Sequence, residues 1–284
     1  MKLDKEVPLN TIAEDMINYD VLFFGEEHND SVTHFLEKKM FELLYAKYDS
    51  NIALSMEMFE RDVQPVMNEY LKGFIREKHF LKDARVWSNY KDYRPMVEFA
   101  KENGLDVICA NAASRYTNLA GRKGEEALMA LPDESKNNFA PLPYDTATGD
   151  YYAKLMGLPK HGAGTTTDTA KGKAAPSMMG MMGGFDLVVA QSLWDATMAY
   201  SIASYRKQNR DNKSKKIMQV NGKFHSDEGF AVATQLKKYS PKTKRLIIST
   251  SSDDDFPKID WSKYKADGDY IIITDPKVPR TYKD

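Results

Sequence analysis

The sequence of 284 residues is long enough for one α/β domain with an insertion, and its 42% of hydrophobic residues suffice for a sizeable core. A formal net charge of −1 gives no reason to expect nucleic-acid binding, and no apolar run approaches membrane-spanning length. The single cysteine, Cys109, excludes an intrachain disulfide bond.

Six short apolar runs, rich in Val, Ile, Leu and Phe, predict β-strands. They are apolar along their whole length rather than alternating, which is typical of parallel strands buried on both faces. The predicted strands cover 21–24, 52–56, 105–109, 217–220, 246–249 and 270–273.

Helical patterns lie between the predicted strands, marked by apolar stripes and by glycine or proline near their ends. We expect helices over 31–48, 96–103, 116–131, 187–205 and 227–239. The alternation of strands and helices predicts the α/β class: a mainly parallel central sheet flanked by helices. We interpret residues 1–284 as a single domain.

The region 141–184 differs from the rest of the chain, because it is rich in Pro, Gly, Thr and Met. Only one short helix, near 151–156, is expected there. An irregular stretch of this length in a compact domain is usually functional or disordered. We therefore interpret it as an insertion that serves as a lid or as a binding or dimerisation segment.

Two motifs of the form Gly-x-x-His, at 25–28 and 222–225, each follow a predicted strand. Ligands of open parallel sheets bind outside the carboxyl ends of the strands, so His28 and His225 are expected to converge. Glu57 follows another strand and is expected at the same edge. These three residues suit either a divalent metal ion or metal-free acid–base catalysis.

Three polar residues near these motifs have two interpretations each. Arg61 either takes part in catalysis or forms an ion pair with Glu57 that fixes a loop. Glu27 either lines the substrate site or favours the positive end of the following helix. His34 either contacts substrate or makes a hydrogen bond within its helix.

The helix predicted over 187–205 carries polar residues on an otherwise apolar face. Gln191, Trp194 and Asp195 share this face. Buried polar groups need partners or a site, so we expect these residues to line the substrate site. A structural hydrogen-bond network is the alternative.

The insertion holds side chains of the types that ligate haem iron, namely Tyr, His and Met. Methionine also provides an adaptable surface for a flat apolar ligand. The alternative is a flexible loop whose methionines pack on the domain or on a partner subunit. The candidate haem contacts are Tyr151, Tyr152, His161 and Met178.

Taken in order, these motifs resemble the ChaN-like family of haem-binding uptake lipoproteins, which is related to the Tiki and erythromycin-esterase groups. The resemblance runs from about residue 21 to about residue 230. It is carried by Phe24-Gly-Glu-Glu-His28 with His34, Glu57-Met-Phe-Glu-Arg-Asp62 with Gln64, Trp87, Tyr90, Tyr93, Pro95 and Glu98, Asn111 with Arg115, Gln191 with Trp194-Asp-Ala-Thr-Met-Ala199, and Gly222-Lys-Phe-His225. The chain departs from the family pattern at Glu37, where Gln is frequent, and at Ser114, where Pro precedes the arginine.

The resemblance implies haem as the ligand and a role in bacterial iron acquisition. It further implies a periplasmic or outer-membrane lipoprotein, and a homodimer that encloses haem with tyrosine ligation. Contact with a membrane is expected only through a lipid anchor outside the given chain. No signal peptide or lipobox is expected here, because Lys2, Leu3 and Asp4 follow Met1 directly.

The relationship to Tiki-type proteins implies a second hypothesis. In those proteins the corresponding residues act in hydrolysis with a metal ion, and here they are His28, Glu57 and His225. A divalent metal ion is then the cofactor. A module that binds some other flat ligand is the third alternative.

Overall fold

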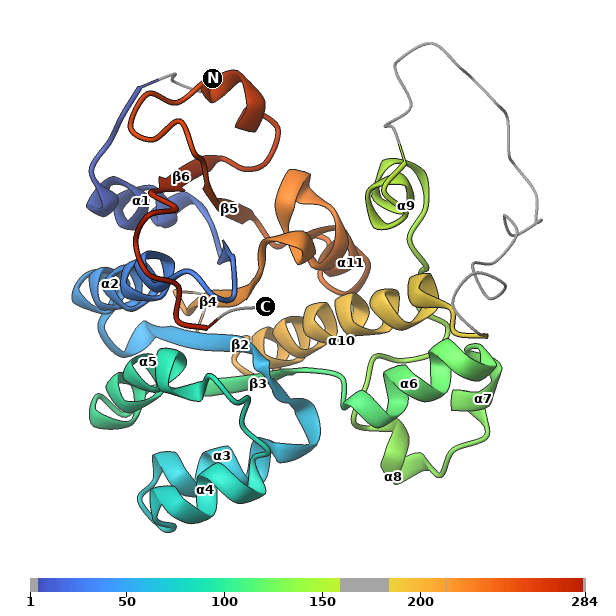
Figure 1. The fold of residues 1–284 in the computed structure, drawn as a ribbon. Coiled ribbons are helices and arrows are strands. Elements are labelled where there is room, and N and C mark those ends of the chain that lie inside the picture. Colours follow the sequence, from blue (N-terminus) through green and yellow to red (C-terminus); the bar gives the residue numbers. More distant parts are fainter. Residues whose placement is uncertain (1–4, 159–183, 213, 283–284) are drawn as a thin grey trace.

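The computed structural model describes residues 5–158, 184–212 and 214–282 of the chain. All six predicted strands form one sheet in the order β3-β2-β4-β1-β5-β6, with every neighbouring pair parallel (Figure 1). This confirms the predicted α/β class. The strands are β1 (Val21–Glu26), β2 (Ile52–Glu60), β3 (Val107–Asn111), β4 (Lys216–Gly222), β5 (Arg245–Ser252) and β6 (Tyr270–Thr274).

The predicted helices are present with three differences in their bounds, and no helix was predicted at Leu9–Asp15, Gln64–Leu71, Glu77–Asp83 or Asp133–Lys136. α5 begins at Tyr90 rather than near residue 96, since the tyrosines of its first turn are buried. The helix expected over 116–131 is split at Gly124, whose positive φ of 79° ends α6. The helix expected from 227 begins only at Ala231, after Glu228 and Gly229 with positive φ. The helices are α1 (Leu9–Asp15), α2 (Ser31–Tyr48), α3 (Gln64–Leu71), α4 (Glu77–Asp83), α5 (Tyr90–Glu102), α6 (Ser114–Lys123), α7 (Glu126–Met129), α8 (Asp133–Lys136), α9 (Gly149–Leu155), α10 (Leu187–Gln208) and α11 (Ala231–Tyr239).

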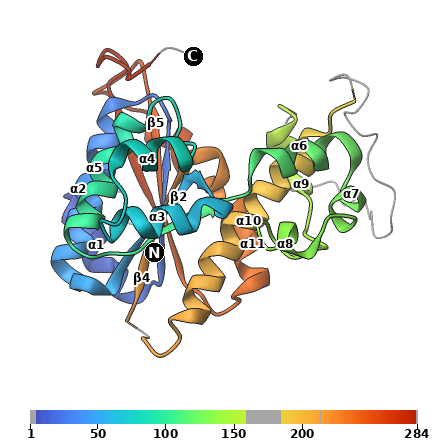
Figure 2. The ribbon, with the colours of Figure 1, turned by 90° about the horizontal axis from the view of Figure 1, so that it is seen from below.

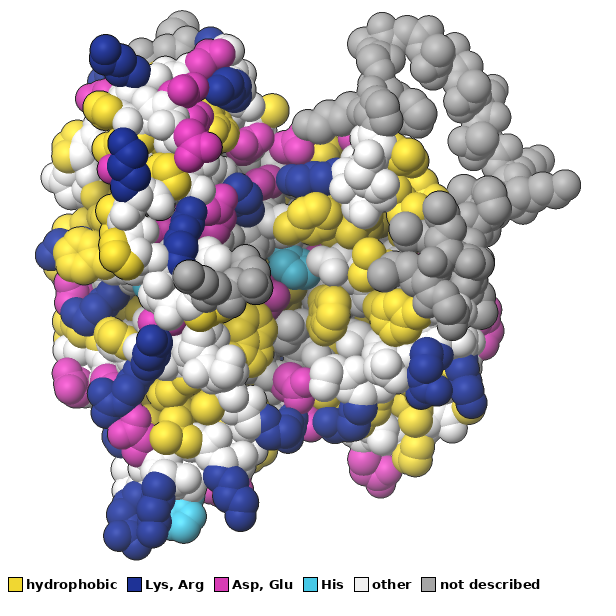
Figure 3. Space-filling model, viewed as in Figure 1, with side chains coloured by type: hydrophobic (Ala, Val, Ile, Leu, Met, Phe, Trp, Pro, Cys, Tyr) yellow, Lys and Arg dark blue, Asp and Glu magenta, His cyan; other side chains and the backbone are white. Residues whose placement is uncertain are grey.

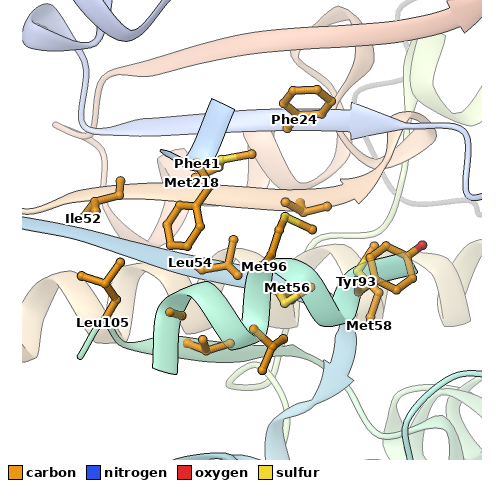
Figure 4. Close-up of a cluster of buried hydrophobic side chains, with 14 of the residues drawn as sticks. Phe24, Phe41, Ile52, Leu54, Met56, Met58, Tyr93, Met96, Leu105 and Met218 are labelled. Atoms are coloured by element: carbon orange, nitrogen blue, oxygen red, sulfur yellow. The ribbon is translucent and has the colours of Figure 1, made fainter. Parts of the chain in front are cut away.

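Helices cover both faces of the sheet (Figure 2). Alternate residues of β1 divide between the two sides, as the period of a strand requires: Leu22 and Phe24 belong to the core under α1, α2 and α5. Val21 and Phe23 belong to the core under α10 and α11. Figure 4 shows the first core, in which side chains from several strands meet those of α2 and α5.

A third apolar cluster lies beside the N-terminal half of α10, against α6, α7 and the segment that precedes α9 (Figure 1). It includes Tyr116, Phe139 and Tyr144 with Leu193 and Ala196 of α10. α9 confirms the short helix expected in the insertion. Within the described ranges, no helix has the length and apolarity needed to cross a membrane.

A glutamine side chain occupies the outer edge of β3, which is an end strand of the sheet. Gln64 Nε2 donates to the carbonyl oxygen of Val107 at 2.8 Å, and its Oε1 accepts from the Cys109 N–H at 2.8 Å. The amide therefore pairs with the free edge as a neighbouring strand would.

Candidate functional site

The carboxyl ends of β1 and β4 bring the two Gly-x-x-His motifs together, as predicted. The strand pairing places Glu26 opposite Gly222, so both motifs leave the sheet at the same level. His28 follows β1 by two residues, and His225 ends a 3-10 turn that directly follows β4. A Cβ atom on Gly222 would lie 2.7 Å from His28 Nε2, so glycine is required for this close approach.

The two histidines open into a cavity of about 610 Å³, which we call the strand-end cavity. Figure 3 shows a histidine exposed at the centre of one face of the molecule, with hydrophobic side chains beside it. Polar and charged groups dominate the lining. The lining residues are Glu26, Glu27, His28, Asn29, Gln191, Gly222, Lys223, Phe224, His225, Arg280 and Tyr282.

A buried carboxylate, Glu26, holds His28 from behind. Nδ1 of His28 donates to Glu26 Oε1 at 2.8 Å, and the Tyr93 hydroxyl donates to the same oxygen at 2.7 Å. Trp87 packs edge-on against the His28 ring, with the centroids 5.2 Å apart. The His28 side chain is 34% exposed, and its Nε2 has no hydrogen-bond partner in the described part of the chain. With Nδ1 committed to Glu26, Nε2 is the uncommitted ring nitrogen of this partly exposed side chain.

The second carboxylate oxygen of Glu26 faces α2. His34 Nδ1 lies 3.1 Å from Glu26 Oε2 and 3.3 Å from Glu37 Oε2, while His34 Nε2 donates to the His28 carbonyl at 3.0 Å. Burial alone would lower the pKa of His34, but the two carboxyl groups raise it to about 11. Burial and the charge of Glu26 raise the pKa of Glu37 well above its ordinary value.

These pKa shifts determine the charges of Glu26, His34 and Glu37. Burial would raise the pKa of Glu26, yet its hydrogen bonds to His28 and His34 lower it below its ordinary value. Glu26 is therefore ionised, His34 is cationic and Glu37 is a neutral acid. The positive charge of His34 balances the buried Glu26 carboxylate, and the proton on Glu37 avoids a second buried negative charge.

On the other side of the cavity, His225 lies between two carboxylates. Its Nδ1 donates to Asp195 Oδ1 at 2.5 Å, and its Nε2 lies 3.4 Å from Glu57 Oε1. The Tyr151 hydroxyl donates to Asp195 Oδ2 at 2.5 Å, and the Gln191 amide lies 3.2 Å from His225 Nδ1. The predicted polar pair of α10 thus meets the second motif.

The two carboxylates determine the charge of His225. Burial would lower its pKa, but Glu57 and Asp195 raise it to about 10, so the ring is cationic at neutral pH. Burial would raise the pKa of Glu57, but the charges of His225 and His28, together with the hydrogen bonds from His225 and Gly222, lower it. For Asp195, burial outweighs His225 and raises the pKa. At neutral pH, His225 is therefore a buried cation and is not available to accept a proton as a general base.

Glu57 reaches this network from within β2 rather than after it. The pairing of β2 with β4 ends at Met56 opposite Val220, and the pairing of β2 with β3 shifts register between Met56 and Glu60. Glu57 is therefore the first residue beyond the β4 ladder, and its Oε2 accepts from the Gly222 N–H at 2.8 Å. Because the pairing of β2 is irregular after Met56, the Glu57 side chain can point toward the site.

The expected ion pair between Arg61 and Glu57 is wrong. Arg61 Nε donates to the Asn137 carbonyl at 3.1 Å, and Nη1 donates to Ser201 Oγ at 2.9 Å. Both carboxylate oxygens of Glu57 instead face Gly222 and His225. Arg61 lines a second cavity, of about 400 Å³, along the outer edge of β3, and it is absent from the lining of the strand-end cavity.

The remaining predicted residues divide by position. Glu27 lines the strand-end cavity, whereas Trp194 packs half-buried between the second and third apolar clusters. Tyr151 is buried with its hydroxyl on Asp195, and Tyr152 is its half-buried neighbour on α9. His161 and Met178 lie outside the described residues.

Sequence reasoning missed several residues of the site. No role in the site was predicted for Glu26, although it shares a strand face with Leu22 and Phe24, which could have indicated burial toward α2. Tyr93 and Trp87 carried the family resemblance, but no contact with His28 was predicted for them. No sequence signal pointed to Arg280 or Tyr282, which arrive from the end of the chain.

The potential metal ligands do not form the predicted set. In the described part of the chain, one group of three such residues has ligand atoms within 4.8 Å of one another, and it comprises Glu26, His34 and Glu37. His28, Glu57 and His225 line or underlie the same cavity without meeting that criterion. The site therefore contains one partly exposed imidazole, His28, hydrogen-bonded to a carboxylate. It also contains one buried imidazolium, His225, which lies between two carboxylates.

Comparisons with known proteins give a family and a fold. The family model described as haem-binding uptake, Tiki superfamily, ChaN matches residues 12–236. The chain is similar to a solved structure of ChaN of Campylobacter jejuni with cofacially bound haem, at 15% identity and a TM-score of 0.61, covering 94% of this chain and 92% of that one. It is also similar to the type III effector HopBA1, at 13% identity and a TM-score of 0.48, covering 95% and 94%. No curated protein sequence matches it. The chain belongs to the ChaN family of haem-binding uptake proteins in the Tiki superfamily.

Proposed function

We propose that the protein binds haem for bacterial iron acquisition, with the haem in the strand-end cavity and the iron on Nε2 of His28. The family match supports haem as the ligand. The observation that carries the site is the hydrogen bond from His28 Nδ1 to the buried Glu26 carboxylate, which leaves Nε2 uncommitted. Ligating histidines commonly donate their other ring N–H to a carboxylate, because this fixes the tautomer and raises the basicity of the ligand.

The residues present fit such a ligand. The cavity of about 610 Å³ lies within the roughly 300–1,000 Å³ of small-molecule sites. Haem, when bound, supplies the iron; the chain supplies the orientation of His28 through Glu26, Tyr93 and Trp87. Tyr151 acts in this proposal through Asp195, as a positioning residue. Tyr152, His161 and Met178 enter it as the contacts that the insertion contributes.

The test is a haemin titration followed by the visible spectrum of the complex. Wild-type protein is expected to give a saturable Soret shift with histidine ligation. His28→Ala should lose that spectrum, and Tyr152→Phe is the comparison that reports tyrosine ligation from the insertion. An unchanged Soret band in His28→Ala would overturn the assignment of the iron ligand, and a non-saturating response of the wild type would overturn haem binding.

The proposal also covers the cellular location and the oligomeric state of the protein. Since the family serves haem uptake, we place the protein outside the cytoplasm, as a periplasmic or outer-membrane lipoprotein. We further propose a homodimer that encloses haem between two copies. Light scattering with and without haemin tests this, because a mass that stays monomeric at saturating haemin contradicts the dimer.

Hydrolysis with a divalent metal ion is a second candidate function. The observation that favours it is the alignment of Asp195, His225 and Glu57 beside the same cavity, with contacts of 2.5 and 3.4 Å. Elemental analysis of purified protein is expected to find a stoichiometric metal that His28→Ala loses, together with turnover on an ester or peptide panel. Absence of both results rejects this function.

A further inference from the structure

Two cationic side chains, Lys223 and Arg280, line the strand-end cavity. They come from distant parts of the chain. Lys223 begins the turn after β4, inside the second Gly-x-x-His motif. Arg280 belongs to the C-terminal segment, which crosses the loop between β1 and α2 (Figure 1). The hydrogen bonds that hold this segment include those from Thr281 N–H to the Asn29 carbonyl at 2.9 Å and from Ser31 Oγ to the Pro279 carbonyl at 2.8 Å.

The two cations share one carboxylate, that of Glu27, which also accepts a hydrogen bond from the Ser252 hydroxyl of β5 at 3.0 Å. Lys223 Nζ lies 2.9 Å from Glu27 Oε1, and Arg280 Nη1 lies 3.3 Å from Glu27 Oε2. Arg280 Nη1 is also 3.1 Å from Asp30 Oδ2. Asp30, however, is occupied as the cap of α2, where its Oδ1 accepts from the N–H groups of Val32 and Thr33.

The guanidinium of Arg280 therefore retains donor capacity. Although buried, its Nη1 has no hydrogen-bond partner of proper geometry within the ranges that the structure describes. A guanidinium is suited to a planar carboxylate, which it can bind through two parallel hydrogen bonds. The Lys223 ammonium, beside it on the same wall, adds a second point charge of the same sign.

We infer that Lys223 and Arg280 form a carboxylate-binding rim that selects porphyrins with free propionate groups. This inference rests on the proposed haem function and adds the basis of its ligand selectivity. Haem combines an iron centre with two carboxylates on one edge, and the cavity combines the uncommitted Nε2 of His28 with Lys223 and Arg280, whose carboxylate partner Glu27 a propionate would replace. Arg280 lies beyond residues 12–236, so this half of the rim is outside the span that the family model matches.

The test uses metal-free protoporphyrin IX and its dimethyl ester, which differ only in the two carboxylates. Affinity is measured by porphyrin fluorescence at low ionic strength, where charge contacts are least screened. Wild-type protein is expected to bind the diacid roughly tenfold more tightly than the diester, the effect of one charge-assisted contact. The double variant Lys223→Gln with Arg280→Gln should lose this preference.

Two further variants sharpen the result. Glu27→Gln removes the competing carboxylate and is expected to strengthen the preference for the diacid, which a merely misfolded variant would not do. Lys207→Gln removes an exposed cation 16 residues along α10 from Gln191, about 24 Å at 1.5 Å per residue, and should preserve the preference.

Equal binding of diacid and diester by wild-type protein overturns the inference, as does an unaltered preference in the double variant. Because the probe carries no iron, the result is independent of His28. If the protein prefers the diacid but its haemin spectrum does not depend on His28, the carboxylate-binding rim is supported and His28 is rejected as the iron ligand. Failure of both porphyrins to bind rejects the rim, whereas the separate haemin titration decides the haem site.

Discussion

Asp195 Oδ1 lies 2.5 Å from Nδ1 of His225, so the imidazolium is fixed from one side while Glu57 faces its other nitrogen. The raised pKa of His225, about 10, gives this contact a pH signature. A histidine with a raised folded-state pKa stabilises the fold fully below its unfolded pKa near 6.5, and that stability is lost as pH rises toward 10.

We therefore expect the stability difference between wild type and His225→Gln to shrink by roughly 1 kcal/mol per pH unit above pH 6.5. Urea denaturation at pH 6.5, 7.5 and 8.5 measures it. The comparison isolates His225, because the raised pKa of His34 affects both proteins alike. A constant difference between the two proteins across this range would contradict a cationic His225.

Glu37→Gln should be tolerated or stabilising at pH 7. The raised pKa means that folded Glu37 keeps a proton that the unfolded chain loses above about pH 4.3, so this residue costs stability as pH rises. Glutamine preserves the shape without that cost. Glu26→Gln, in contrast, leaves the cationic His34 without its carboxylate and should cost about 3–5 kcal/mol. Thermal unfolding at pH 7 measures the stability of both variants. Equal losses of stability in Glu37→Gln and Glu26→Gln would reject a neutral Glu37.

Gly222→Ala should weaken haemin binding at least tenfold, an effect of about 1.4 kcal/mol. The added Cβ lies 2.7 Å from His28 Nε2, the proposed iron ligand, and displaces or covers it. Gly104→Ala is the matched control: its φ of 63° strains the backbone, while nothing lies within 4 Å of the new atom. Absorbance titrations should show the loss in the first variant alone. Normal binding by Gly222→Ala would count against His28.

Haemin affinity should rise with pH. Burial lowers the pKa of His28, but the hydrogen bond with Glu26 and the charge of Glu57 outweigh it and raise the pKa above 6.5. Iron requires neutral imidazole, so binding releases the proton and tightens as pH passes through the raised pKa. Glu26→Gln should move this midpoint to lower pH. Titrations between pH 6 and 9 test the prediction, and an affinity that falls with pH would oppose it.

The fold was largely predictable because the inner strands are buried on both faces and are therefore apolar along their length. Val21–Phe24 and Ile52–Met56 show this, and both continue as strands into the polar residues of the site. Those extensions were not predictable, since Glu26 and Glu57 look like turn residues. Their place in a strand depends on partners from α2 and β4 that are distant in sequence.

For the site, the sequence predicted which strand ends meet but not which side chains pair. The Gly-x-x-His spacing located His28 and His225, and the polar pair of α10 located Gln191 and Asp195. The reach of Arg61 toward α10 could not be inferred, because Ser201 and Asn137 carry no motif. Arg280 depends on the path of the last residues of the chain, which follows no local pattern.

The pairing of Gln64 with β3 has a consequence for how copies of the protein can associate. An open end strand invites a second chain to extend the sheet, a route to aggregation and to strand exchange. Here the amide of Gln64 already satisfies Val107 and Cys109 at that boundary. Any stable self-association through β3 would first have to break these two hydrogen bonds, so a specific oligomer is better served by surfaces away from this edge.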